Sequence, residues 1–289
     1  MIDETAEEIR SMRTHSSSVV AAKAAHALEA LLDREYPSVE EYLRELEHNS
    51  SALRRANPSH ASLVTTQREI VEAVRAADPD SVPAAKARTE GAIAEVVSTI
   101  ETAKHEAAEA TADRIEDGAT VLTHDYSSTV LEALEAAARD GAHLQVYVTE
   151  ARPRHLGRKT ARVLGEIDRI ETTLIVDSAA GHYLQAVDEV VIGMDCIVED
   201  RLYNRVGTYM IAATAADQDV PVTVTGSSAK VVGDGFRFEN DFRPISEVIR
   251  EPPEGFEVGN PAYDATPLRL VDTLVTEEGA TELSGDGLN

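Results

Sequence analysis

Hydrophobic positions change their spacing partway along the chain. Up to about residue 117 they recur at helical spacing, and residues 84–116 carry small and aliphatic residues in a heptad pattern that predicts one long helix. After Asp117-Gly118, short β-rich runs alternate with amphipathic helical runs. These runs predict strands at residues 119–124, 143–149, 172–176, 188–192 and 222–225, and a predicted helix follows each of the first four.

Alternating strands and helices are typical of a parallel sheet with right-handed crossovers. We therefore expect the α/β class, with an N-terminal helical domain at residues 1–117 and a Rossmann-like parallel-sheet domain at residues 118–276. Residues 277–289 are mostly small or polar, and this composition predicts a disordered tail.

Polar residues follow the predicted strands, at the sheet edge where open α/β proteins bind ligands. The clusters are His124-Asp125, Glu150 to Pro153, Asp177-Ser178 and Gly193 to Asp195. The sequence contains no glycine-rich dinucleotide loop, no nucleoside triphosphate loop, no hydrolase nucleophile elbow and no zinc-spaced His/Cys cluster. We expect a ligand crevice that uses no cofactor and no metal.

Several segments, taken in order, carry a family resemblance. They are THDYSSTVLEAL, TEARPRHLGRKTARVL, DSA, GMDCIVEDRLYNRVGTYMIA and NPAYDATPLRLVDTLVTEEG. Together they resemble the alpha/beta/delta subunit family of eukaryotic translation initiation factor 2B, which also includes ribose-1,5-bisphosphate isomerase and methylthioribose-1-phosphate isomerase. The likeness covers essentially the whole chain, and it implies a homodimer or a larger ring.

The resemblance also implies site residues by position. Asp195 matches the catalytic Asp of the isomerases, Asn204 matches their Asn, and Arg152 matches their phosphate-contacting Arg. Arg205 stands where the isomerases have Lys. Lys230 stands where the family has a Lys near the ligand.

Two positions differ more sharply from the isomerases. Asp125 stands where they have a catalytic Cys, and His15-Ser16-Ser17 stands where they have a phosphate-binding Arg-Gly-Ala turn. A carboxylate at Asp125 brings a second negative charge close to Asp195, which raises the pKa of one of the two acids and repels a phosphorylated ligand. Ser16 and Ser17, at a helix N-terminus, can still donate hydrogen bonds to a phosphate. A purely structural role for Asp125, as the cap of the following helix, stays open.

These substitutions favour a binding protein over an enzyme. We expect a regulatory protein similar to the initiation factor 2B subunits, which retains a sugar-phosphate or nucleotide pocket and contacts initiation factor 2. The alternative is a ribose-1,5-bisphosphate isomerase, an aldose-ketose isomerase in which Asp125 replaces the usual Cys. The catalytic residues would then be Asp195 and Asp125.

Two features of the composition, its charge and its single cysteine, indicate the setting in which the protein works. The chain has 52 acidic and 27 basic residues, a net charge of −25, and the acids are spread along its length. A diffuse acidic excess is typical of the cytoplasmic proteins of extreme halophiles, and it disfavours binding to the nucleic-acid backbone. The single cysteine, Cys196, excludes an internal disulfide, and no apolar run predicts a membrane span. We expect a cytoplasmic, haloarchaeal protein.

The charge predicts that stability depends on salt. Lowering KCl from molar to millimolar concentration should lower the melting temperature, because repulsion among the acids is then no longer screened. Thermal unfolding followed by circular dichroism measures the effect. A melting temperature that does not change with KCl contradicts the halophilic interpretation.

Overall fold

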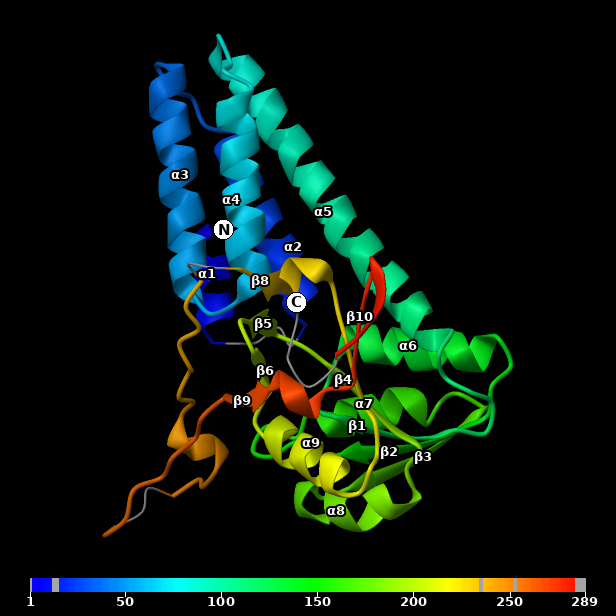
Figure 1. Ribbon diagram of the computed structural model, residues 1–289. Coiled ribbons are helices and arrows are strands. Elements are labelled where there is room, and N and C mark those ends of the chain that lie inside the picture. The colour runs from blue at the N-terminus through cyan, green and yellow to red at the C-terminus, as the bar shows by residue number, and fades with distance from the viewer. Residues whose placement is uncertain (1, 12–15, 234–235, 252–253, 284–289) are drawn as a thin grey trace. The chain divides into compact units, whose positions relative to one another are not determined.

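A computed structural model describes the chain except at residues 1, 12–15, 234–235, 252–253 and 284–289. The chain divides into two units, Met1–Thr102 and Ala103–Asn289 (Figure 1). The division falls inside the long helix α5, Val82–Ala112. The predicted domain boundary at residue 117 lies 15 residues after Thr102, the last residue of the first unit, because the hydrophobic spacing changes only just before the first strand.

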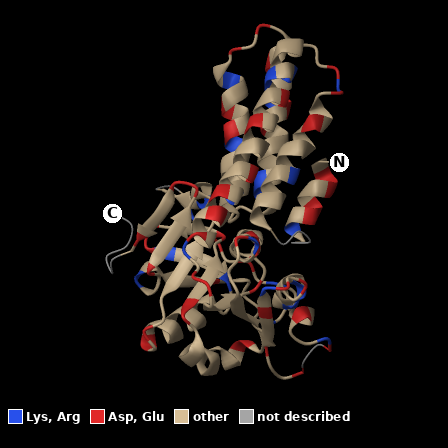
Figure 2. Ribbon diagram, turned by 90° about the vertical axis from the view of Figure 1, so that its right-hand side faces the viewer, with Lys and Arg blue, Asp and Glu red and all other residues tan. Residues whose placement is uncertain are grey.

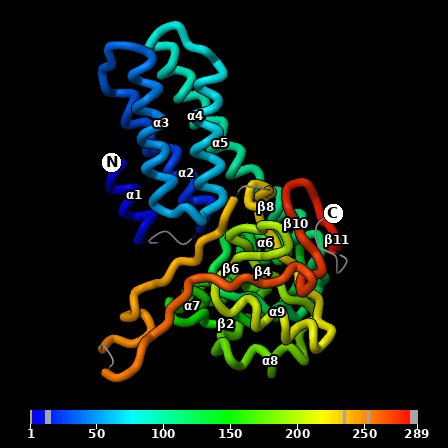
Figure 3. The backbone as a smooth tube through the Cα atoms, turned by 60° about the vertical axis from the view of Figure 1, so that its left-hand side comes forward, coloured from blue at the N-terminus to red at the C-terminus, as the bar shows by residue number. Residues whose placement is uncertain are grey.

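The first unit is helical, as the hydrophobic spacing predicts. Its elements are α1 (Ile2–Arg10), α2 (Ser17–Ala27), η1 (Leu28–Leu31), α3 (Val39–Ala56), α4 (Ala61–Ala76) and most of α5. Helix α3 begins where the Ser38 hydroxyl accepts a hydrogen bond from the Glu41 amide. Tyr42 is fully buried in this unit and donates a 2.8 Å hydrogen bond to the Thr89 hydroxyl of α5. The helices run alongside one another (Figure 3).

The second unit contains a seven-stranded sheet with the order β11-β10-β7-β4-β1-β2-β3. All its pairs are parallel except β10 with β11. The strands are β1 (Thr120–His124), β2 (Leu144–Thr149), β3 (Ile170–Ile175), β4 (Glu189–Gly193), β7 (Val222–Thr225), β10 (Thr273–Thr276) and β11 (Gly279–Glu282). The six parallel strands have the Rossmann order, so the predicted fold class is confirmed.

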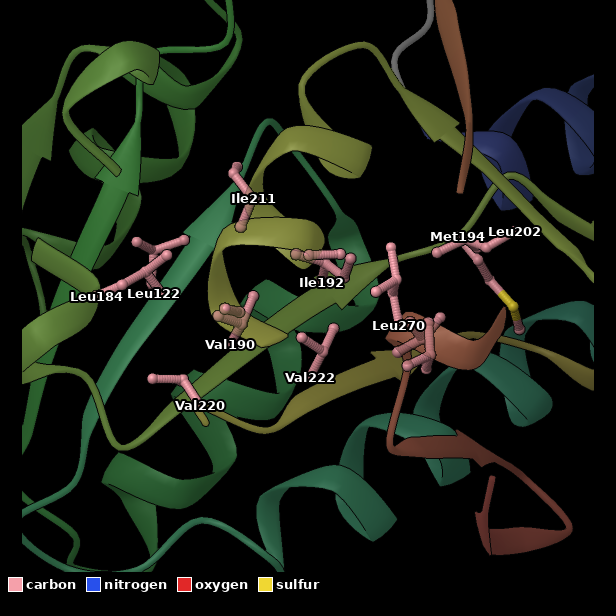
Figure 4. Packing of buried hydrophobic residues seen from close by; sticks show 14 of the residues in the cluster. Leu122, Leu184, Val190, Ile192, Met194, Leu202, Ile211, Val220, Val222 and Leu270 are labelled. Carbon is pink, nitrogen blue, oxygen red and sulfur yellow. The ribbon is translucent and has the colours of Figure 1, made fainter. Parts of the chain in front are cut away.

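Both faces of this sheet are buried, which explains why its central strands are continuous apolar runs. In β4, Val190 and Ile192 enter one core with helices α8 (Ala180–Tyr183) and α9 (Thr208–Asp217), as Figure 4 shows in part. Val191 points the opposite way. It enters a second core with α6 (Ser128–Arg139) and α7 (Gly157–Leu164). Period-two alternation therefore assigns adjacent residues to different cores.

A second, smaller sheet has the order β8-β5-β6-β9 and was not predicted. Its strands are β5 (Cys196–Val198), β6 (Arg201–Arg205), β8 (Val231–Val232) and β9 (Tyr263–Pro267). The hairpin β5–β6 lies between β4 and α9, in a stretch whose charged residues obscure its alternation. Every second residue of β6 is buried. This hairpin carries Arg205 back toward the end of the large sheet.

The five strands predicted from the apolar runs are present, each with ends within a few residues of those expected. The disordered tail expected after residue 277 needs correction. Residues 279–282 form β11, which pairs antiparallel with β10 across a turn at Glu277-Glu278, and Gly279, the first residue of β11, has a φ of +110°. Its polar residues form a strand because the buried β10 supplies the hydrogen-bonding partner. Residues 284–289 lie outside the described part of the chain.

Acidic residues are spread along the chain in both units (Figure 2). Within the described ranges, no helix is long and apolar enough to cross a membrane.

Candidate functional site

The candidate site lies where the connections of the large sheet change direction. Strand β1 leads to β2 on one side, and β4 leads to β7 on the other, although β1 and β4 pair directly. Asp125 follows β1, and Asp195 follows β4. The carboxyl ends of two such strands form the crevice in which doubly wound sheets bind ligands. The topology therefore brings together two acids that are 70 residues apart in sequence.

Arg205 lies between these two acids. Its Nε is 3.5 Å from Oδ2 of Asp125 and 3.7 Å from Oδ2 of Asp195. The Asp125, Asp195 and Arg205 side chains are 7%, 14% and 16% exposed, respectively. The guanidinium also lies over the Tyr263 ring, 4.9 Å from its centroid. One buried cation thus contacts two carboxyl groups.

Burial and neighbouring charges shift the pKa values of Asp125 and Arg205. Burial raises the pKa of Asp125, and the negative charge of Asp195 raises it further, while Arg205 and His124 act in the opposite direction. Burial alone would lower the pKa of Arg205, but Tyr263, Asp195 and Asp125 together outweigh this effect and the pKa is raised. Arg205 therefore stays charged, and Asp125 is the acid that tends to retain a proton.

The backbone at Asp125 has a left-handed conformation, with φ of +63°. Asp adopts this conformation more readily than most residues. The Asp125 carbonyl accepts a 2.7 Å hydrogen bond from the Thr160 hydroxyl. Helix α6 is capped by Ser127, whose hydroxyl accepts from the Val130 amide. The alternative role of Asp125 as the helix cap is therefore wrong, and its carboxyl faces Arg205.

Two glycines allow the close approach of these loops. A Cβ atom at Gly193, the last residue of β4, would lie 2.4 Å from the Ser127 hydroxyl oxygen. At Gly207, which precedes α9 with φ of +110°, it would lie 2.8 Å from Cε1 of His124. His124 itself is buried between the Thr149 hydroxyl, at 2.6 Å, and the Val206 carbonyl, at 3.0 Å. These contacts give His124 a structural role at the end of β1.

Lys230 and Asn204 support the site without lining its cavity. The buried Lys230 amine donates a 2.9 Å hydrogen bond to the carbonyl of Met194, the residue before Asp195, and burial lowers its pKa. Asn204 precedes Arg205 on β6, so its side chain points to the opposite face. It donates a 3.0 Å hydrogen bond to the Thr208 hydroxyl.

A cavity of about 30 Å³ adjoins Asp125 and Arg205. Arg152 lines it, and the phosphate contact that the family resemblance implies for Arg152 stays a prediction. The cavity also has charged and polar lining residues that the sequence did not single out, namely Arg154, Arg243, Glu247 and Asn260. Arg154 completes the Arg-Pro-Arg sequence, and Asn260 begins NPAYD, so both lie in motifs that had been noticed only for their resemblance.

Ser16 and Ser17 belong to the first unit. Ser16 directly precedes α2, without a side-chain hydrogen bond to the helix, and Ser17 is the buried first residue of α2. His15 lies outside the described residues. The proposed phosphate contact of these serines stays a prediction. Among the described residues, no group of three His, Cys, Asp or Glu side chains is arranged to hold a metal ion.

The fold and the site define a class, a Rossmann-like α/β protein with a cluster of buried charges at the switch point of its sheet. Comparison with known proteins then shows the family. The chain matches the Initiation factor 2 subunit family over residues 13–283, and it belongs to that family.

The curated relatives match this chain over nearly their whole length. The chain is 34% identical to a ribose 1,5-bisphosphate isomerase of Haloterrigena turkmenica, over 95% of this chain and 88% of the relative. It is 32% identical to the enzyme of the same name from Thermococcus kodakarensis, over 96% and 89%. Among solved structures, the translation initiation factor eIF-2B of Pyrococcus horikoshii superposes with a TM-score of 0.85 at 25% identity, over 99% of this chain and 98% of that one.

These relatives correct the regulatory interpretation. Six curated relatives named ribose 1,5-bisphosphate isomerase match at 30% to 34% identity, whereas the putative initiation factor relative from Pyrococcus furiosus matches at 29%. Asp125 in place of Cys favoured the noncatalytic interpretation, because the negative charge of the carboxyl was considered without any neighbouring cation. That interpretation did not include Arg205, which contacts that carboxyl. The expected contact with initiation factor 2 stays an untested prediction.

The raised pKa of Asp125 predicts a pH effect on stability. Folding favours the protonated acid, so this contribution is lost as pH rises through the folded-state pKa. Asp125→Asn cannot ionise, so its melting temperature should gain on that of the wild type as pH increases. Differential scanning calorimetry at several pH values, in molar KCl, measures this difference.

Asp219→Asn is the matched control, because Asp219 is exposed and also has a positive φ, of +56°. Its melting temperature should follow the wild type at every pH. Parallel curves for Asp125→Asn and the wild type contradict the assignment of a raised pKa to Asp125.

Proposed function

We propose that this protein is an aldose-ketose isomerase that converts ribose 1,5-bisphosphate to the corresponding ketose. The observation that carries the proposal is the arrangement of Asp125, Arg205 and Asp195 at the switch point, beside a cavity lined by arginines. The six isomerase relatives support the substrate class.

The reaction requires two groups that transfer protons and one positive charge that stabilises negative charge on the sugar oxygen. Aldose-ketose isomerisation transfers one hydrogen between C1 and C2 and leaves the composition of the sugar unchanged. Asp125, which tends to retain its proton, suits the donor to a sugar oxygen. Asp195 suits the base that takes the hydrogen from C2 as a proton and returns it to C1, while the proton released by the C2 hydroxyl restores Asp125. Two acids with different environments can divide these roles, as carboxyl pairs do in other enzymes.

Arg205 suits the stabilisation of negative charge that develops on the sugar oxygen. Its guanidinium is held by both acids and by the Tyr263 ring, so little reorientation is needed during the reaction. It also offsets the repulsion that a second carboxyl would exert on a phosphorylated substrate. In this proposal, the exchange of Cys for Asp and the exchange of Lys for Arg compensate each other.

The cellular location, the adaptation to high salt and the oligomeric state are also part of this proposal. A cytoplasmic, halophilic protein agrees with the net charge of −25 and with the similarity to a Haloterrigena relative. A homodimer or larger ring agrees with the apolar side chains exposed on the segment before β9, among them Phe242 at 71% and Phe256 at 62% exposure. Size-exclusion chromatography in molar KCl would test it.

The proposal predicts turnover that depends on both acids. Purified protein in molar KCl should convert ribose 1,5-bisphosphate, and Asp195→Asn should lower kcat by about 10² to 10⁴, the usual contribution of a proton-transferring group. Asp125→Asn should cause a loss of the same order. Phosphorus NMR of substrate and product measures the conversion.

Asp200→Asn serves as the control, since Asp200 is an exposed acid at the β5–β6 turn, close in sequence to Asp195. It should retain wild-type turnover. Absence of conversion by the wild-type protein, with the fold intact, would overturn the proposed function. Unchanged turnover in Asp195→Asn would overturn the assigned role of that acid.

A further inference from the structure

Three nitrogen donors converge on the carboxylate of Glu247. Nη2 of Arg243 lies 2.9 Å from Oε1 of Glu247, and Nε of Arg154 lies 3.9 Å from the same oxygen. Nδ2 of Asn260 donates to Oε2 at 3.3 Å. The Arg243, Arg154 and Glu247 side chains are 10%, 19% and 22% exposed. Two guanidiniums and an amide around one anion are the donor set that proteins use for phosphate groups.

Positive charge is concentrated at this place. Arg154, Arg205 and Arg243 all line the same small cavity. Burial lowers the pKa of Arg154, and the charges of Arg205 and Arg243 lower it further, which shows that the guanidiniums repel one another. An anion among them relieves this repulsion. A phosphate dianion would do so more fully than the single charge of Glu247.

Glu247 is carried by an element with little packing of its own. It ends the single-turn helix η5, Ile245–Glu247, which has no buried residue. The donors are more firmly held. The Arg243 amide donates to the Asn260 carbonyl at 2.8 Å, Asn260 is 4% exposed, and Arg154 follows β2 of the large sheet. The carboxylate can therefore leave at less cost than its donors can move.

We propose that Arg154, Arg243 and Asn260 form a binding subsite for a phosphate group of the substrate, and that Glu247 occupies this subsite in the free protein. This inference rests on the proposed function, which identifies the substrate as a sugar bisphosphate. Glu247 already accepts the hydrogen bonds of Arg243 and Asn260, so a phosphate that binds the same donors replaces the carboxylate. This subsite, next to Asp125 and Arg205, would select sugars that carry a phosphate at the matching end.

The subsite can be tested with inorganic phosphate alone. Glu247→Gln removes the competing charge while preserving the side-chain shape, so phosphate should bind about tenfold more tightly than to the wild type, since one fewer ion pair must be broken. Arg243→Gln should weaken binding by about tenfold or more. Isothermal titration calorimetry at one fixed KCl concentration measures both. If Glu247→Gln does not fold, Glu247→Ala replaces it, with the same expected direction.

Glu251→Gln is the matched control, because Glu251 is an exposed acid in the same segment. Phosphate should bind this variant as it binds the wild type. Equal phosphate affinity in the wild type, Glu247→Gln and Glu251→Gln would overturn the subsite. A change of equal size in Glu247→Gln and Glu251→Gln would also overturn it, because the effect would then come from net charge alone.

Enzyme kinetics separate the subsite from the proposed function. With ribose 1,5-bisphosphate, KM should fall in Glu247→Gln and rise in Arg243→Gln. If the wild type shows no turnover but the phosphate affinities change as expected, the proposed function fails and the subsite stands. If turnover is present but neither KM nor phosphate affinity responds to Glu247→Gln, the subsite fails and the proposed function stands.

Discussion

The site depends on one buried arginine between two acids. Without Arg205, the acids after β1 and β4 would face each other in a poorly solvated crevice with no cation between them. Without the acids, the guanidinium would be a buried cation with a large desolvation cost. The contact also joins the large sheet to the small one, because Arg205 ends β6 while both acids follow strands of the large sheet. The fold therefore brings these charges together, and the charges in turn connect its two sheets.

Much of the fold could be predicted because its central strands are buried on both faces. Such strands are short apolar runs, and the order in which they alternate with helices predicts a parallel sheet. The hairpin β5–β6 and the edge strand β11 could not be found this way. Their sequences are partly polar, and they become strands through pairing with neighbours that are distant in sequence or already buried. A local sequence pattern does not show such tertiary contacts, so it could not predict these strands.

The same reasoning explains what was predicted of the site. Asp125 and Asp195 could be placed together because both follow strands that meet at one sheet edge. Their joint contact with Arg205 could not be predicted, because it requires the β5–β6 hairpin. Arg243 and Glu247 come from a segment with little regular structure, and only its folding against the end of β2 brings them to the cavity. The error about function had the same source, since a carboxyl was judged without its cation.

In the proposed enzyme, Asp125 and Arg205 act as one unit, exchanged together for the Cys and Lys that the isomerase resemblance implies. A double-mutant cycle of Asp125→Cys, Arg205→Lys and the combined variant tests it, with kcat/KM for ribose 1,5-bisphosphate as the measured quantity. We expect the combined variant to be more active than either single variant, because each single change leaves one partner mismatched. Losses that simply add in the combined variant would contradict it.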